Sequence, residues 1–224
     1  MSRAILSWSS GKDGAFALDV AWQAGIEVVA LLTTVTERYA RVSIYGVRRE
    51  VLVAQADAVG LPLIEVPLPS PCPNEAYEAR MKASLAPLRA QGIEEVVFGD
   101  IFLSDVRAYR EERLAAIGMR AHFTIWGRET RALADDMLRA GTVAQVVTLD
   151  PVRLPREMIG APYDASFLAA LPDGVDPCGE NGEFHTVVSD GPAFAHPVSL
   201  TMGGSIEQDG FIYADFGLGV DQHA

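Results

Sequence analysis

The hexapeptide SSGKDG, residues 9–14, combines small residues with a lysine in a pattern suited to phosphate binding. It follows an apolar, β-compatible run at residues 3–8 and precedes residues 14–25, where Ala, Leu and Trp recur at helical spacing before a glycine. The first turn of a helix has unpaired N–H groups and partial positive charge, so a small-residue loop there can surround an anion. Lys12 would add a full charge and, as an exposed loop residue, should contribute little to stability. On this pattern alone, an ordinary strand-to-helix turn remains the alternative.

A second candidate for chemistry is FGDI, residues 98–101, which ends a strand-like run. This position would bring Gly99 and Asp100 to the edge of the sheet where the first loop also lies. There the carboxylate of Asp100 can hold Mg²⁺ or a ribose hydroxyl, or it can cap a loop.

The third candidate is DPCGENGEFHTVV, residues 176–188, a non-periodic loop that leads into a β-compatible run. Its glycines allow close backbone approach, and Glu180 and Glu183 beside Asn181 suit contacts to a polar substrate or a metal. Each member also has an ordinary explanation: the glutamates as solvated turn residues, His185 as a half-buried strand residue, Cys178 as a small core residue. The clustering favours a functional site.

The elements that position these loops alternate along the first two thirds of the chain. Apolar strand-like runs lie at 27–34, 61–68, 94–101 and 143–150, and amphipathic helices begin near 47 and cover about 74–90, 105–117 and 129–140. The helix at 74–90 has Tyr77, Met81, Leu85 and Leu88 on one face. This alternation predicts an α/β fold whose parallel sheet is covered on both faces.

After residue 150 the pattern changes, because prolines and glycines become frequent and helices scarce. The runs at 197–204 and 210–217 predict two antiparallel strands joined by a turn. We therefore expect a nucleotide-binding domain at residues 1–150 and a smaller α+β domain at 151–224.

Composition restricts the class of partner. The chain has 224 residues, 49% of them apolar, and a net charge of −12, which disfavours nucleic acid and acidic membranes as partners. No apolar run approaches the roughly 20 residues that span a bilayer, and no signal segment is evident, so we expect a cytoplasmic protein. Cys72 and Cys178 are far apart and lack the spacing of a zinc site, so we expect reduced thiols.

Together these segments resemble a known family. SSGKDG is similar to the PP-loop signature S-G-G-x-D-S of ATP pyrophosphatases, and residues 99–114, 123–130 and 176–188 resemble signature segments of the diphthine-ammonia ligase family. The resemblance covers about residues 4 to 190. It implies a Rossmann-like PP-loop domain in which ATP is split between its α and β phosphates, a substrate carboxylate becomes an acyl-adenylate, and ammonia displaces AMP.

The resemblance also implies roles for individual residues. Residues expected to bind ATP are Ser9, Ser10, Gly11, Lys12, Asp13, Gly14, Gly99 and Asp100. Lys12 is the first choice of essential residue, and Asp13 and Asp100 are candidates for Mg²⁺. Residues expected on the substrate side are Glu180, Asn181, Glu183 and His185, with the two glutamates as further catalytic candidates and their separate roles open.

Two features leave the function open. Gly14 stands where the signature has its final serine, which removes one hydroxyl donor and favours a nucleotide-binding sensor or regulatory protein as the alternative to a ligase. Arg107, Arg110 and Arg113 share one side of a helix and are either phosphate or protein contacts or a solvated face paired with glutamates. Sulfur transfer to RNA is disfavoured by the acidic charge and the lack of paired catalytic cysteines. The resemblance leaves the carboxylate substrate open, with a carboxylate on a protein as one candidate and a homodimer as a candidate assembly.

Overall fold

The computed structural model describes residues 3–38, 41–42 and 46–219. Within them the chain forms two sheets, five helices of ten residues or more, and two short helical segments.

The first sheet is parallel apart from one short strand. β1 (Arg3–Ser7) lies at its centre, flanked by β2 (Glu27–Thr36) and β5 (Glu95–Phe98), with β4 (Leu63–Leu68) beyond β2 and β6 (Arg120–Phe123) beyond β5. The two-residue β3 (Arg41–Val42) pairs antiparallel with the end of β2. This arrangement confirms the predicted α/β class, and β6 is a strand that the sequence pattern did not indicate.

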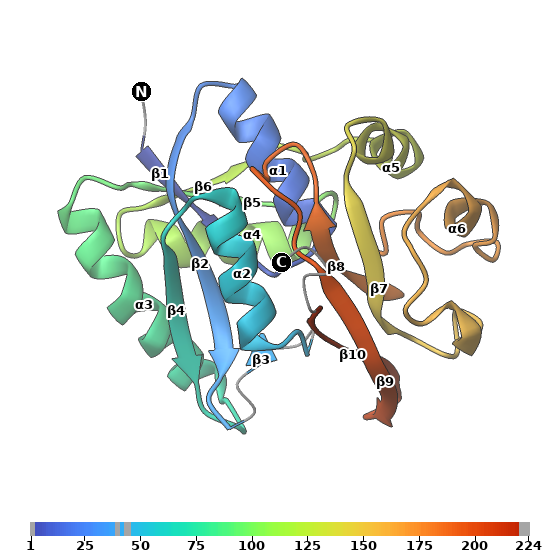
Figure 1. Ribbon diagram of the computed structural model, residues 1–224. Coiled ribbons are helices and arrows are strands. Elements are labelled where there is room, and N and C mark those ends of the chain that lie inside the picture. The colour runs from blue at the N-terminus through green and yellow to red at the C-terminus, as the bar shows by residue number, and fades with distance from the viewer. Residues whose placement is uncertain (1–2, 39–40, 43–45, 220–224) are drawn as a thin grey trace.

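Helices cover both faces of this sheet, as Figure 1 shows. α1 (Lys12–Gln23) and α2 (Arg49–Val59) lie between the two sheets, whereas α3 (Asn74–Ala90) and α4 (Ser104–Ala115) cover the opposite face of the first sheet. α2 begins two residues later than predicted and α3 has the bounds that the apolar periodicity indicates. α3 and α4 each have only one buried residue, Leu85 and Leu114 respectively.

The second sheet is antiparallel, in the order β8 (Phe184–Asp190), β7 (Val143–Leu149), β10 (Phe211–Leu218), β9 (Leu200–Gln208). The expectation that residues 143–150 extend the parallel sheet is therefore wrong, because β7 pairs with β8 and β10. The predicted closing hairpin is confirmed: Asp209 and Gly210 join β9 to β10 with φ values of 51° and 85°, as a two-residue hairpin turn requires.

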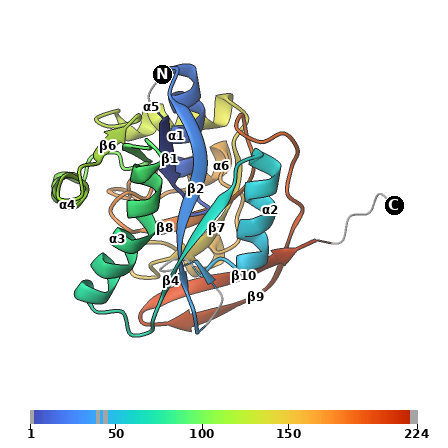
Figure 2. The same cartoon turned by 90° about the vertical axis from the view of Figure 1, so that its left-hand side faces the viewer.

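A shared hydrophobic core connects the two sheets. It includes residues of α1, α2, β1 and β2 together with Val146, Val187 and Phe216 of the second sheet. α5 (Thr130–Arg139), the 3₁₀ segment Arg156–Met158 and α6 (Ala165–Ala169) complete the chain, and Figure 2 shows β9 and β10 running beneath the first sheet and its helices. Because α1 packs between the sheets, residues far apart in sequence meet at its first turn. The division at residue 150 remains a prediction.

Candidate functional site

The predicted anion loop connects the carboxyl end of β1 to the start of α1. Ser10 has a φ of 70°, a left-handed conformation that is unusual for a residue other than glycine, and its side chain is fully buried. Gly11 lies against β8: a Cβ added there would be 3.3 Å from the carbonyl oxygen of Thr186. The backbone N–H of Lys12 donates to Oγ1 of the same threonine at 3.2 Å. The second sheet thus supports the first turn of α1 directly.

Gly99 allows a second close approach to this turn. A Cβ added at Gly99 would lie 2.9 Å from the carbonyl carbon of Asp13 and 2.9 Å from the backbone nitrogen of Gly14. Those are backbone atoms, which cannot move aside as a side chain can. The missing side chain therefore lets the end of β5 contact the start of α1.

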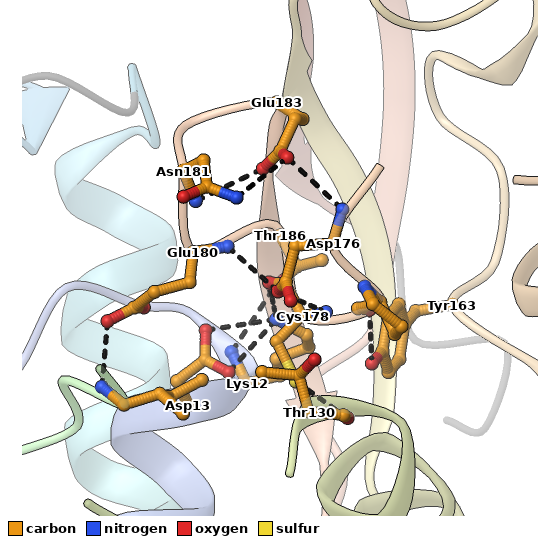
Figure 3. A network of polar contacts seen from close by, with 12 residues as sticks. Lys12, Asp13, Thr130, Tyr163, Asp176, Cys178, Glu180, Asn181, Glu183 and Thr186 are labelled. Carbon is orange, nitrogen blue, oxygen red and sulfur yellow. Dashed lines mark hydrogen bonds and ion pairs between the residues drawn. The ribbon is translucent and has the colours of Figure 1, made fainter. Parts of the chain in front are cut away.

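Lys12 is 1% exposed, so the expectation of an exposed loop lysine is wrong. Its Nζ lies 3.0 Å from the carboxylate of Asp13, donates to the carbonyl oxygen of Cys178 at 2.6 Å, and lies 5.0 Å from the ring centre of Tyr163 and 5.5 Å from that of Phe184 (Figure 3). Burial alone would lower the pKa of Lys12, but the neighbouring negative charges, Asp13 first, raise it above its ordinary value. Its charge joins α1 to the 176–183 loop.

Asp13 shares this buried ion pair. Its side chain is 28% exposed, and burial raises its pKa although the ammonium of Lys12 opposes that shift. Lys12 and Asp13 are the first two residues of α1. The ammonium of Lys12 is enclosed, whereas the carboxylate of Asp13 reaches solvent.

Glu183 organises the 176–183 loop from within. Its carboxylate is 1% exposed and accepts hydrogen bonds from the backbone N–H groups of Asp176 and Asn181 and from Nδ2 of Asn181, each at 3.1 Å. The Oδ1 atom of Asp176 in turn accepts from the N–H groups of Cys178 and Glu180. Figure 3 shows these contacts closing the loop above Lys12. The carboxylate of Glu183 therefore holds the backbone of the loop in place, which is a structural role.

Glu180 connects this loop to the segment that follows β5. Its Oε1 accepts from the N–H groups of Ile101, at 2.7 Å, and Phe102, at 3.4 Å. Burial first, together with the nearby charges of Asp13 and Asp100, raises the pKa of Glu180 to about 7, although the hydrogen bond from Ile101 opposes this shift. A carboxyl group with this pKa can take up or release a proton near neutral pH.

Asp100 and the three arginines of α4 are engaged in ion pairs. Nε of Arg110 lies 3.0 Å from Oδ2 of Asp100, and its guanidinium lies 4.4 Å from the ring centre of Phe98. Arg107 pairs with Glu111 at 2.8 Å, as a solvated helix face predicts. Arg113 pairs with the carboxylates of Glu78 and Glu112.

A cavity of about 750 Å³ opens between α3 and α4 over the first sheet. It borders the predicted anion loop at Ser9 and includes Arg110 and Arg113 in its wall. Tyr77, Met81 and Leu85, the helix face that the sequence assigns to the core, line this cavity as well. The volume and the largely apolar floor are those of a small-molecule site.

The comparison with family models decides the classification. The model of the diphthamide synthase N-terminal domain matches residues 1–121, more than half of the 224-residue chain. The chain belongs to this family. The diphthamide synthase family consists of PP-loop proteins that use ATP, in agreement with the motif at residues 9–14. A search of the curated proteins finds no match.

Three polar residues that the sequence analysis did not single out support the site. Thr186 supports the helix start, Asp176 shapes the loop, and Gln55 of α2 donates to the carbonyl oxygens of Ser10 and Val188. Asp176 and Thr186 lie in the quoted 176–188 segment. Gln55 gives no sequence signal, because it is one polar residue on an otherwise apolar helix face.

The remaining candidate residues from the sequence are His185 and Cys178. His185 is the second residue of β8, and burial first, then the charge of Lys12, lowers its pKa to about 4, so its ring is neutral at pH 7. Burial raises the pKa of Cys178 to about 12, and its Sγ lies 3.4 Å from the carbonyl oxygen of Thr130. Cys178 is thus a buried, neutral thiol, and both cysteines are free, as predicted.

The two carboxylates predicted to hold Mg²⁺, Asp13 and Asp100, are each paired with a cationic side chain. Among the described residues no group of three or more His, Cys, Asp or Glu side chains is placed to hold a metal ion. Mg²⁺ is commonly bound by one or two carboxylates together with substrate phosphates, and Asp13 and Asp100 would suffice for that. Among residues 3–38, 41–42 and 46–219, no helix has the length and apolar character needed to cross a membrane.

Proposed function

We propose that this protein is an ATP-dependent carboxylate–amine ligase of the diphthine-ammonia ligase type. A substrate carboxylate oxygen attacks the α phosphorus of ATP and pyrophosphate leaves. Ammonia then attacks the acyl carbon of the adenylate, a proton is lost from its nitrogen, and AMP leaves as the amide forms. The family supports the use of ATP, and the chemistry of both steps is our inference.

The observation that carries this proposal is the meeting of three parts at one edge of the first sheet. The loop at residues 9–14 and the ionisable carboxyl group of Glu180 lie at the start of α1, and the cavity on the other face of the sheet reaches this edge at Ser9. A phosphate-binding helix start, a proton acceptor and a pocket for the rest of the ligand are what the two steps require.

Each residue then has a role. The N–H of Lys12 already donates to Thr186, so the partial positive charge of the first turn of α1 and the N–H groups on either side of Lys12 bind pyrophosphate and stabilise the charge that develops on it. The cavity accepts the adenosine. Asp13 and Asp100 would hold Mg²⁺, which supplies positive charge to the phosphates when bound.

The segment from residue 151 onward would supply the substrate side. Ionised Glu180 takes the proton that the attacking ammonia loses, and the exposed amide of Asn181 binds the acyl substrate beside it. Neutral His185 lies near the start of β8, directly after the loop that carries Glu180 and Asn181. Glu183 keeps these groups in position through its hydrogen bonds within the loop.

The test is product analysis with purified protein, ATP, Mg²⁺, ammonium and a library of carboxylates. The proposal expects AMP and pyrophosphate in equal amounts, with an amide formed only when both a carboxylate and ammonium are present. Carboxylate-dependent exchange of labelled pyrophosphate into ATP, measured without ammonium, isolates the first step. Release of ADP and phosphate would rule out adenylation.

A nucleotide sensor is the second candidate, and Gly14 is the observation that favours it. The residue offers no hydroxyl to a phosphate, and the ammonium of Lys12 is already bound to Asp13 and Cys178. ATP binding with a normal affinity but no exchange with any carboxylate would support this candidate over the ligase.

A further inference from the structure

Gln55 is a fully buried polar residue on α2, and it lies far in sequence from every motif of the site. Its side-chain amide forms three hydrogen bonds in the described structure, and all three partners lie in the loop or in the segments that lie beside it. Oε1 accepts from Nε1 of Trp8 at 3.2 Å, and Nε2 donates to the carbonyl oxygens of Ser10, at 3.2 Å, and Val188, at 2.6 Å. One side chain therefore joins the end of β1, the loop and β8.

The contact with Ser10 determines the direction of a peptide group. The Ser10 carbonyl accepts from Gln55 and also from the backbone N–H of Val188, at 2.9 Å, so it points toward α2 and β8. In a planar trans peptide the carbonyl of one residue and the N–H of the next point in opposite directions. The N–H of Gly11 is therefore directed away from α2 and β8, and no described residue accepts a hydrogen bond from it.

This orientation has an energetic cost that the same contacts offset. Ser10 holds a φ of 70°, and its buried Oγ has no hydrogen-bond partner within the described structure. A residue other than glycine keeps such a conformation only when its surroundings impose it. Here the two hydrogen bonds to the Ser10 carbonyl impose it.

We propose that Gln55 is a positioning residue for the pyrophosphate site: it holds the Ser10–Gly11 peptide so that the Gly11 N–H donates to a bound phosphate oxygen. The inference rests on the proposed function in one respect, since it takes residues 9–14 to bind the phosphates of ATP. It adds a residue of α2, outside every signature segment, to the determinants of that site.

The test compares Gln55→Met, which has a similar volume but no hydrogen bonds, with Val51→Ala, which removes buried volume one turn earlier in the same helix at a side chain that forms no hydrogen bond. Calorimetric titration with inorganic pyrophosphate probes the loop alone, and titration with adenosine probes the cavity. We expect Gln55→Met to lower pyrophosphate affinity by about tenfold or more and to leave adenosine affinity unchanged. Val51→Ala should change neither, although it lowers the melting temperature.

The variant Ser10→Gly supplies a second, independent readout. Glycine adopts a φ of 70° without strain, so the loop should depend less on Gln55. We expect Gln55→Met to lower pyrophosphate affinity less in the Ser10→Gly background than in the wild type, and this rescue would not occur if Gln55 only stabilised the fold.

The outcomes separate the two proposals. If the wild type binds pyrophosphate and Gln55→Met binds it equally well, the role of Gln55 is wrong and the proposed function stands. If the wild type binds neither pyrophosphate nor ATP, the assignment of the loop itself fails. Equal losses for Gln55→Met and Val51→Ala would show a general stability effect and overturn the positioning role.

Discussion

The ammonium nitrogen of Lys12 lies 2.6 Å from the carbonyl oxygen of Cys178, 166 residues further along the chain. This contact joins the first helix of the parallel sheet to the loop that carries Glu180. The lysine is enclosed by Tyr163 and Phe184, and its charge is balanced by Asp13. Its position therefore couples the stability of the protein to the geometry of the site.

Lys12→Met is expected to destabilise the protein as well as to impair ATP turnover. The substitution leaves the partly buried carboxylate of Asp13 without its partner, which costs about 2–3 kcal/mol after allowance for the exposed part of that side chain. The measurement is urea denaturation, with Arg139→Met at an exposed ion pair as the control. Unfolding midpoints that match the wild type would mean that the buried pair contributes nothing.

Glu180→Gln tests the raised pKa of Glu180, which burial moves to about 7. The folded state holds this proton more tightly than the unfolded state, so ionisation makes the wild type lose stability as pH rises from about 4.5 to 7. The variant has no such loss and should gain relative to the wild type, from near zero at pH 4 to about 3 kcal/mol at pH 8. Denaturation curves at both pH values measure the difference.

The same variant separates binding from chemistry. Glu180→Gln should leave ATP affinity within about threefold of the wild type but depress amide formation at least about a hundredfold, as expected for loss of a general base. A loss of ATP affinity as severe as that of Lys12→Met would move Glu180 to the nucleotide pocket.

Glu183→Gln should act on the loop and not on proton transfer. The amide replaces one acceptor oxygen by an NH₂ group that faces N–H donors, so the loop loses hydrogen bonds and about 2 kcal/mol of stability. Hydrogen exchange of the Asp176 and Asn181 amides should accelerate. Exposed Glu157→Gln is the matched control, and unchanged protection of both amides would contradict the scaffold role.

Gly14→Ser should be tolerated and should tighten pyrophosphate binding. Gly14 is not among the glycines with positive φ, and a Cβ there meets only the carbonyl oxygen of Ser7, at 3.8 Å. The added hydroxyl restores the final residue of the signature, and a hydrogen bond to a charged group contributes about 1.5–3 kcal/mol, or about tenfold or more in affinity. Calorimetry with pyrophosphate and ATP decides; unchanged affinity at an unchanged melting temperature would argue against phosphate contact at this position.

Gly99→Ala should displace the start of α1. The new Cβ would lie 2.9 Å from backbone atoms of Asp13 and Gly14, so the helix must shift, at a cost of about 1–3 kcal/mol or more. ATP affinity should fall with it. Gly204→Ala, where nothing lies within 4 Å of the added atom, should leave both stability and affinity unchanged.

The sequence by itself determined the features that depend on neighbours along the chain. The strand, loop and helix at residues 3–23, the helix at 74–90 and the closing hairpin follow from local periodicity and turn residues. The motif at 9–14 indicated the family only together with the segments at 99–114, 123–130 and 176–188. These elements can be predicted because the apolar periodicity and the boundary residues of each lie within about 20 consecutive residues.

Only the tertiary structure decided which of these elements meet. A strand pattern does not specify its partner, so β7 could be placed in the second sheet only by its pairing with β8 and β10. In the same way, the hydrogen bond from Lys12 to the carbonyl oxygen of Cys178 forms only because the lysine is buried against the 176–183 loop. The hydrogen bond from Gln55 to Ser10 forms only because α2 packs beside the loop at residues 9–14. The physical reason is that hydrogen bonds and desolvation act over a few ångströms in space, whatever the separation along the chain.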